Sequence, residues 1–268
     1  MATPLPTAKQ HEGEYEDLLS LWSDLETALS LLLSKPLLIH DFPGRLRQLD
    51  VWLQDLVAHD NDAALYLMFQ LAATSTASYT ASHALVCATL CHILAQELKL
   101  PAAERDSLVR AALTMNIGMT ALQDQLAQQR EKPTPQQQEA IQNHPLQSQA
   151  LLARLFITDP LWLDVVGQHH AHISDRIPLE SQTPPDRLTR ILGTIDRYAA
   201  MISPRKSRAG RSATDSVRAI VGQEVEQNDE VSYALVRAIG LCPPGTFRQL
   251  DNGHTASVWR RSEKAKHP

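Results

Sequence analysis

The sequence contains little glycine, little cysteine and few aromatic residues. It has 10 glycines and 3 cysteines in 268 residues, and aromatic residues make up 5%. So few glycines disfavour a strand-rich fold with many tight turns. Three cysteines do not form the disulfide framework of a small secreted domain, which fits a reducing compartment, so we expect a cytoplasmic protein.

Strong net charge and long apolar runs are also missing. The formal charge of −5 gives no broad electrostatic reason to bind nucleic acid or an anionic membrane surface. Residues 63–96 carry no Asp, Glu, Lys or Arg, but the apolar run over 63–73 is about half the ~20 residues of a membrane span. The N-terminus has no apolar signal core. We therefore expect no membrane span and no nucleic-acid partner.

What the sequence does contain favours helices. Hydrophobic residues make up 43%, Leu, Ala and Gln are abundant, and 16 prolines mark turns. Apolar residues repeat at helical spacing over 14–34, and a second helix is predicted from Pro43 towards Asp60. These two helices predict an N-terminal helical hairpin extension over residues 1–59, with no feature that suggests chemistry.

The rest of the chain predicts further helices and one hairpin. Thr134 and Pro135 are typical of an N-cap and a first helical position. Asp251-Asn252-Gly253 is a strong turn signal between strands at 246–250 and 255–260. The predicted fold class is therefore all-α with a short C-terminal β-hairpin. The helix expected from 101 over 115 is interrupted near 118. The other expected helices cover residues 61–71, 78–98, 145–156, 160–170, 185–202, 213–225 and 230–239.

Cysteine and histidine offer two candidates for a metal site. Cys87 and Cys91 lie four residues apart in an apolar helix, and their simplest interpretation is two small buried side chains. His169 and His170 are more suggestive, because two adjacent imidazoles near a helix end can face one pocket. Without further context, a polar helix terminus is still the favoured explanation.

An ordered series of short motifs supplies that context and resembles the HD-GYP domain family. The similarity extends over about residues 60–258 and is more specific than any single motif, which leaves residues 259–268 as a polar tail. It implies a helical bundle of the HD type. The matching segments are Tyr-Thr-Ala-Ser-His at 79–83, Ala-Ala-Leu-Thr-Met-Asn-Ile-Gly-Met at 111–119, His-Pro at 144–145, Gln-His-His at 168–170, the helix around 190–200, and Ser-Pro-Arg-Lys-Ser-Arg at 203–208.

The resemblance implies a site for metal ions and cyclic di-GMP. Members of the family bind two or three ions, commonly iron or manganese, and bound water attacks a cyclic di-GMP phosphodiester. Arg205 and Arg208 match basic positions near the ligand phosphates, although a solvated basic loop would show the same pattern. The metal ligands that the resemblance implies here are His83, His144, His169, His170 and Asp196.

The sequence departs from the family where the chemistry is most demanding. Met115 and Asn116 stand where the family has His-Asp, and Met119 replaces a Lys expected to position phosphate. A thioether is a poor ligand for Mn²⁺ or Fe²⁺, and a neutral amide lacks the charge that holds two cations together. We therefore expect no catalytic residues at these three positions and no efficient diesterase activity.

Three hypotheses follow from this combination. The leading one is a catalytically impaired HD-GYP-type signalling module that acts through protein contacts, with cyclic di-GMP as a retained ligand and a diguanylate cyclase as one kind of partner. It requires no metal, although residual iron or manganese is compatible with it. The alternatives are a residual metal-dependent cyclic di-GMP phosphodiesterase and a regulatory domain of the HDOD type.

Overall fold

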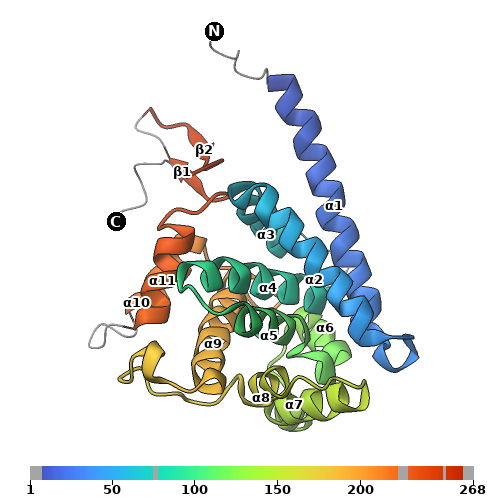
Figure 1. The fold of residues 1–268 in the computed structure, drawn as a ribbon. Helices are drawn as coiled ribbons and strands as arrows, with labels where there is room; N and C mark the ends of the chain where they lie inside the picture. Colours follow the sequence, from blue (N-terminus) through green and yellow to red (C-terminus); the bar gives the residue numbers. More distant parts are fainter. Residues whose placement is uncertain (1–7, 75–77, 223–228, 250–251, 262–268) are drawn as a thin grey trace.

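The computed structural model describes residues 8–74, 78–222, 229–249 and 252–261 (Figure 1). The described chain is almost entirely helical, as the composition predicted. Its elements are α1 (Ala8–Ser34), η1 (Pro36–Leu38), α2 (Phe42–His59), α3 (Asn61–Thr74), α4 (Tyr79–Glu97), α5 (Ala102–Thr114), η2 (Ile117–Met119), α6 (Thr120–Gln128), α7 (Pro135–Arg154), α8 (Pro160–Gln168), η3 (Leu179–Ser181), α9 (Pro184–Ile202), α10 (Ala213–Gly222), α11 (Glu230–Ile239), β1 (Phe247–Gln249) and β2 (Thr255–Ser257).

Helix α4 is the centre of the bundle. Sixteen of its nineteen residues are buried, because α5, α9, α3, α1 and α11 pack around it. A helix that is buried on all sides carries no charged face, which explains why residues 79–96 lack charged side chains. Figure 1 shows α4 crossing the middle of the molecule, with α7 and α8 at one end and the β-hairpin at the other. Polar side chains on α4 therefore lie inside the fold.

The N-terminal helices pack into the same core as the rest of the chain. Trp22, on α1, and Leu46, on α2, belong to one buried cluster with Leu85 of α4. A buried polar contact also joins the two parts, since Asp50 accepts hydrogen bonds from His92 at 3.1 Å and from Arg110 at 3.2 Å. The proposed boundary near residue 59 therefore lies within a continuous core, not in an open linker.

Two predicted helix boundaries are wrong. The helix expected from Pro145 begins ten residues earlier, at Pro135, where Thr134 and Gln137 form a capping box. Pro145 then lies inside α7, because one lost backbone hydrogen bond does not end a long packed helix. The helix expected to reach His170 ends at Gln168. Both corrections fall beside the histidines of the site.

The C-terminal hairpin is confirmed but shorter than predicted. Strands β1 and β2 pair antiparallel with Phe247 opposite Ser257. Within the expected turn, Asp251 lies outside the described residues, and Gly253 adopts the positive φ of 82° that favours glycine. The segment after β2 packs back onto α3, where the rings of Trp259 and Tyr66 lie 5.1 Å apart.

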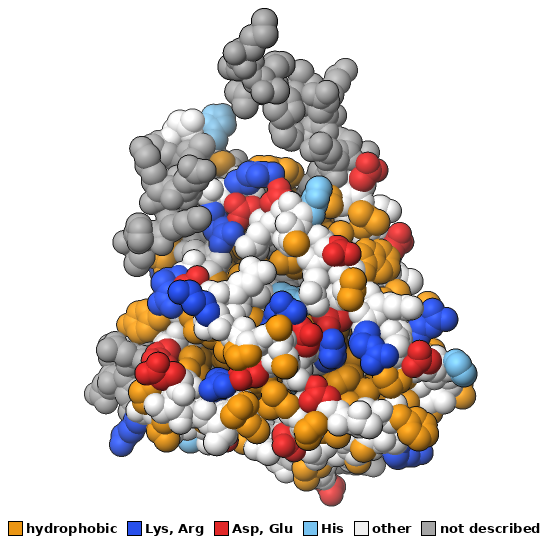
Figure 2. Space-filling model, viewed as in Figure 1, with side chains coloured by type: hydrophobic (Ala, Val, Ile, Leu, Met, Phe, Trp, Pro, Cys, Tyr) orange, Lys and Arg blue, Asp and Glu red, His pale blue; other side chains and the backbone are white. Residues whose placement is uncertain are grey.

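Two further expectations concern the charge of the surface and the presence of a membrane-spanning helix. On the face in Figure 2, acidic and basic side chains are interspersed among hydrophobic ones, without a large region of one sign. None of the helices in the described ranges is long and apolar enough to cross a membrane.

Candidate metal and ligand site

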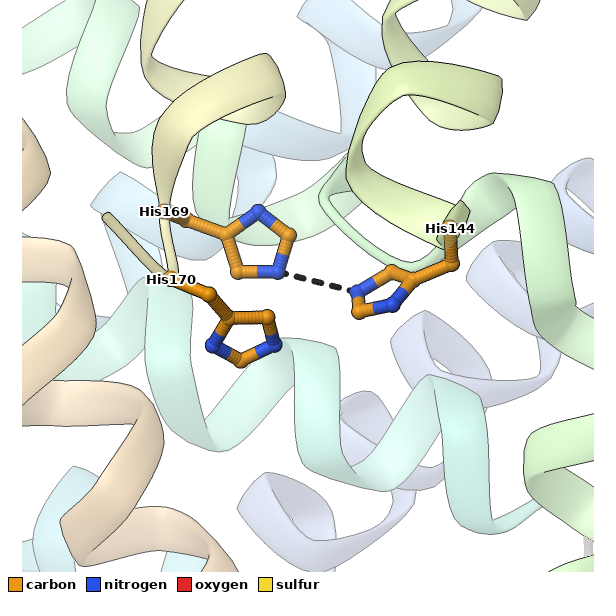
Figure 3. A group of neighbouring side chains, drawn as sticks. All are labelled: His144, His169 and His170. Carbon is orange, nitrogen blue, oxygen red and sulfur yellow. Dashed lines mark hydrogen bonds between the residues drawn. The ribbon is translucent and has the colours of Figure 1, made fainter. Parts of the chain in front are cut away.

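Three histidines from two helices meet beside α9. His144 lies in the middle of α7, His169 caps the C-terminus of α8, and His170 follows it (Figure 3). The imidazole centres are 4.9 Å apart for His144 and His169, 5.2 Å for His144 and His170, and 4.2 Å for His169 and His170. One ligand nitrogen of each ring lies within 4.8 Å of the others. The three histidines that the resemblance implied as ligands are thus brought together.

The contacts between His144, His169 and their neighbours need one more hydrogen than two neutral imidazole rings carry. The Nδ1 atom of His144 lies 2.6 Å from the Ile141 carbonyl oxygen, and that of His169 lies 2.7 Å from the Val166 carbonyl oxygen. The two Nε2 atoms face each other at 3.0 Å. Three close contacts need three hydrogens, but two neutral imidazoles carry two. A proton on one ring, or a metal ion between the two Nε2 atoms, would make all three contacts favourable.

The surroundings disfavour a cationic ring. Burial and, next, the nearby charge of His170 lower the pKa of His169 to about 4, despite the opposing attraction of Asp196. Burial also lowers the pKa of His144. Neutral rings whose Nδ1–H groups bind carbonyls present lone pairs at Nε2, the form in which histidine binds metal. If two nitrogens each bind one ion at about 2.1 Å and the two bonds form a right angle, the nitrogens lie roughly 3.0 Å apart. The two Nε2 atoms have this separation, so a divalent cation fits this cluster.

A second group of candidate ligands lies on α4 and α9. His83 Nε2 is 2.8 Å from Asp196 Oδ1 and 3.6 Å from Cys87 Sγ. The ligand atoms of all three residues lie within 4.8 Å of one another. Asp196 connects this group to the histidine cluster, because its charge influences both His144 and His169. All five residues that the resemblance implied as metal ligands therefore lie in one region.

Asp196 is held as a carboxylate. Burial alone would raise its pKa, but the hydrogen bond and charge of His83, together with His169 and His170, lower the pKa below its ordinary value. Among the residues that the structure describes, Asp196 is the single carboxylate in either group of candidate ligands. The site therefore offers four imidazoles, one thiol and one negative charge.

The N-terminus of α4 fixes the position of His83. Ser78 caps the helix by accepting a hydrogen bond from the backbone N–H of Ala81 at 3.2 Å. The Asp124 carboxylate accepts from the backbone N–H of Thr80 at 2.8 Å and from its hydroxyl at 2.9 Å. Negative charge at a helix N-terminus is stabilising, so this end of α4 is well anchored one turn before His83.

Two close backbone approaches position the histidine-bearing helices. A Cβ atom on Gly118 would lie 2.8 Å from the backbone nitrogen of Ser148, one turn after His144. The Gly118 N–H also donates to the Ser148 hydroxyl at 3.0 Å. A Cβ atom on Gly193 of α9 would lie 3.0 Å from the His169 carbonyl oxygen. Glycine at both positions lets η2 and α9 approach the helices that carry the ligands.

The three positions at which the sequence departs from the family pattern lie at the end of α5 and in η2. Met115 and Asn116 are buried, and Met119 is half-buried. Asn116 precedes η2, and its carbonyl oxygen accepts a hydrogen bond from Met119. A buried thioether and a neutral amide thus occupy the segment from which the resemblance expects a ligand and a bridging carboxylate.

The predicted basic residues lie in a loop at the edge of the site. Arg205 lies with its guanidinium carbon 4.9 Å from the centre of the Tyr79 ring and donates to its hydroxyl at 3.0 Å. Tyr79 in turn stacks on His83, at 5.9 Å between ring centres. Arg208 donates to the carbonyl oxygen of Ala200. Arg205 therefore adjoins the candidate ligands through Tyr79, whereas Arg208 lies further along the exposed loop.

A polar pocket opens beside this stack. Its volume is about 350 Å³, and Tyr79, Arg205, Lys206 and Asp124 contribute polar groups to its lining. A second pocket of about 260 Å³ is lined by His170 and residues of α9. The second pocket thus reaches one candidate ligand, His170, whereas the first lies beside His83 behind the Tyr79 ring.

One candidate ligand was missed by sequence reasoning. Cys87 was interpreted as a buried packing residue, and its burial is confirmed. However, it lies four residues after His83 on the same helix, and that spacing places both side chains on one face. This spacing was the available signal once His83 was recognised.

Sequence comparison assigns a family and finds one curated relative. The sequence model of a family described as "HD domain" matches residues 65–230. The protein "Cyclic di-GMP phosphodiesterase PA4108" of Pseudomonas aeruginosa is 28% identical over 186 residues, which cover 67% of this chain and 44% of that protein. The chain thus spans less than half the length of this curated relative.

A solved structure resembles the fold over most of the chain. It is that of Bd1817, described as an HDG"Y"P protein from Bdellovibrio bacteriovorus, with a TM-score of 0.58 and 13% sequence identity. The match covers 80% of this chain and 68% of the other. At this identity the likeness extends to the fold alone.

Proposed function

Because this chain belongs to the HD domain family, and within it resembles the HD-GYP proteins, we propose that it is a signalling module that binds cyclic di-GMP at a metal-holding pocket and hydrolyses it poorly or not at all. The module acts through protein contacts made in response to the ligand, in the cytoplasm. The observation that carries the proposal is the pair of facing Nε2 atoms of His144 and His169, in a site with one carboxylate.

The choice of ligand rests on similarity and on charge. The Pseudomonas aeruginosa relative is named a cyclic di-GMP phosphodiesterase. In this chain, Arg205 and Lys206 line the pocket next to the candidate metal ligands, and a guanidinium group suits phosphate oxygens. Tyr79 offers an aromatic ring beside the same pocket. A ligand with two phosphates and two planar bases matches these groups.

The residues present favour retained metal binding over a role without metal. His144, His169 and His170 would hold one ion, with Asp196 as the nearby negative charge. A bound divalent cation would polarise a phosphoryl oxygen and lower the pKa of bound water. The chain contributes neutral imidazoles whose Nδ1–H groups are fixed by backbone carbonyls. These hydrogen bonds orient the rings before any ion arrives.

Hydrolysis is expected to be weak because the negative charge is insufficient. A two-metal centre holds its cations together with carboxylate bridges, and Asn116 supplies no charge where the family has an aspartate. Asp196 alone does not neutralise two divalent ions. Each tenfold loss of rate corresponds to about 1.4 kcal/mol of barrier, and losing a metal pair removes several such factors.

Protein contacts form the output in this proposal. A domain that binds a second messenger without consuming it can signal only by presenting a different surface to another protein. A diguanylate cyclase is the kind of partner that the resemblance suggests. The chain spans 44% of its curated relative, so the activity and partners of that whole protein do not transfer directly.

The enzyme hypothesis remains the main alternative. It is favoured by the intact histidine cluster and by Asp196, which together could support slow turnover at a single ion. The HDOD-type alternative is less well supported, because His83, His144 and Asp196 would be expected on unrelated surfaces, whereas here they share one region.

Calorimetric titration with cyclic di-GMP tests the proposal. The metal-free protein and the protein loaded with Mn²⁺ or Fe²⁺ would be titrated, and the recovered nucleotide analysed for the linear product. We expect binding that strengthens with metal and little or no product. The His169→Ala variant should lose the metal-dependent part, whereas His172→Ala, at an exposed neighbouring position, should not. Multiple turnovers that disappear in His169→Ala would establish the enzyme alternative.

A further inference from the structure

The thiol of Cys87 points at the same place as two candidate ligands. His83 and Cys87 lie one turn apart on α4, and Asp196 reaches them from α9. The His83 Nε2 atom is 3.6 Å from Cys87 Sγ and 2.8 Å from Asp196 Oδ1. A nitrogen, a sulfur and an oxygen therefore surround one point between two helices.

These separations suit a single tetrahedral ion. Zinc binds imidazole nitrogen at about 2.0–2.1 Å and thiolate sulfur at about 2.3 Å, which places the two ligand atoms roughly 3.5 Å apart at a tetrahedral angle. The separation of His83 Nε2 and Cys87 Sγ matches this value. The shorter contact of His83 with Asp196 is a hydrogen bond, and it would lengthen by roughly half an ångström if an ion replaced the shared proton.

The His83 ring makes its hydrogen-bond contacts on the side that faces this point. Its Nδ1 atom is buried and has no hydrogen-bond partner, while Nε2 faces both Asp196 and Cys87. Because Nδ1 is not the atom that faces Cys87, the case for an ion rests on the contacts of Nε2. Cys91, one turn further along α4 and equally buried, is not part of the group.

We propose that Cys87 is a metal ligand, so that His83, Cys87 and Asp196 hold a zinc-type cation in place of the iron or manganese expected from the resemblance. The inference rests on the metal-holding part of the proposed function and deepens it. Thiolate ligands select zinc over manganese and magnesium, which prefer oxygen and nitrogen. Binding converts the thiol to a thiolate, and its proton passes to solvent.

The consequence is a site with two different halves. The histidine cluster offers three nitrogens, whereas the group around Cys87 offers nitrogen, sulfur and oxygen. A zinc ion in the second half would be firmly held and leave one tetrahedral position open. It would compensate for part of the binding lost with the His-Asp pair, without supplying a bridging carboxylate.

Cobalt substitution tests the proposal. The full chain, stripped of metal by chelation, would be titrated with Co²⁺ while near-ultraviolet absorption is recorded. We expect the charge-transfer band of a thiolate bound to cobalt, and Zn²⁺ should abolish it by displacement. Cys87→Ser should lose the band and bind Zn²⁺ at least tenfold more weakly. Cys91→Ser, matched in helix and burial, should keep both.

X-ray absorption at the zinc edge of the wild-type chain provides a test that needs no variant. We expect one sulfur ligand at about 2.3 Å. A zinc-loaded chain without sulfur in its coordination shell, or a cobalt band that persists in Cys87→Ser, would overturn the proposal. Failure of cyclic di-GMP to bind while the band is present would instead contradict the proposed function and leave Cys87 as a ligand.

Discussion

The Nε2 atoms of His144 and His169 face each other at 3.0 Å, although both rings already use Nδ1–H to bind backbone carbonyl oxygens. The packing of α7 against α8 thus holds two lone pairs against each other. Such an arrangement costs free energy in an empty site, and a cation between the nitrogens would recover it. The predictions below follow from this relationship and from the packing that supports it.

Removing one of the facing rings should remove metal. His169→Ala is expected to lower metal affinity by more than the roughly tenfold to hundredfold typical of losing a group that only supports a ligand. Elemental analysis after dialysis against a limiting concentration of Mn²⁺ or Zn²⁺ gives the bound stoichiometry. His172→Ala, at an exposed position three residues further on, should retain the wild-type value. Equal loss in both variants would contradict a specific role for His169.

As the pH falls, the metal-free protein should begin to lose stability at a higher pH than protonation of its carboxylates would explain. Burial lowers the pKa of His169 from 6.5 to about 4. Between these values the unfolded chain binds a proton that the folded chain does not, so the free energy of unfolding falls as the pH falls, by roughly 3 kcal/mol at most. Urea unfolding at several pH values in the presence of a chelator measures this slope. His169→Gln should flatten it between pH 6.5 and 4, and an unchanged slope would contradict the assignment.

The polar contact between the N-terminal hairpin and the bundle should be important for stability. Burial alone would raise the pKa of Asp50, but hydrogen bonds from His92 and Gln54 and the charge of Arg110 lower it, so the buried carboxylate is ionised and paired. Asp50→Ala leaves its partners unpaired and should reduce the free energy of unfolding by about 3–5 kcal/mol. Urea denaturation measures the loss. Asp55→Ala, exposed on the same helix, should change it by less than about 0.5 kcal/mol.

Two glycines near the site should respond oppositely to alanine. A Cβ atom on Gly118 would press on the backbone of α7 at 2.8 Å, and the backbone has no easy way to move. We expect Gly118→Ala to cost about 1–3 kcal/mol. On α8, a Cβ atom on Gly167 would meet only the movable end of the Gln149 side chain, so Gly167→Ala should be neutral or stabilise by up to about 1 kcal/mol. Thermal unfolding of the two variants compares their stabilities directly. Equal effects would show that the close approach of Gly118 to α7 is not what determines the stability of the Gly118→Ala variant.

Local sequence signals predicted most of the fold. Apolar periodicity located the helices, and Thr134 with Pro135 marked a helix start that the structure confirms. The helix through Pro145 was divided wrongly, because a proline inside a helix and a proline at its start look alike when packing is unknown. Propensity could not show that α7 continues, since its burial depends on how α8 and η2 pack against it, which local sequence does not specify.

The site was predictable only through the order of its motifs. No spacing rule brings His83 and Asp196 together, because 113 residues separate them and the contact depends on how α4 packs on α9. The resemblance supplied that pairing. It did not point to Cys87, which the family pattern does not include, and only the geometry around His83 makes it a candidate ligand.

Anomalous X-ray scattering from crystals of the metal-loaded protein, measured at the zinc, iron and manganese edges, tests the central claim most directly. We predict an ion bound to the Nε2 atoms of His144 and His169. Any ion at His83 and Asp196 should form a separate site, with no side chain bridging the two. A pair of ions about 3.5–4 Å apart, held together by a carboxylate side chain, would contradict it, because such a centre could activate water for hydrolysis.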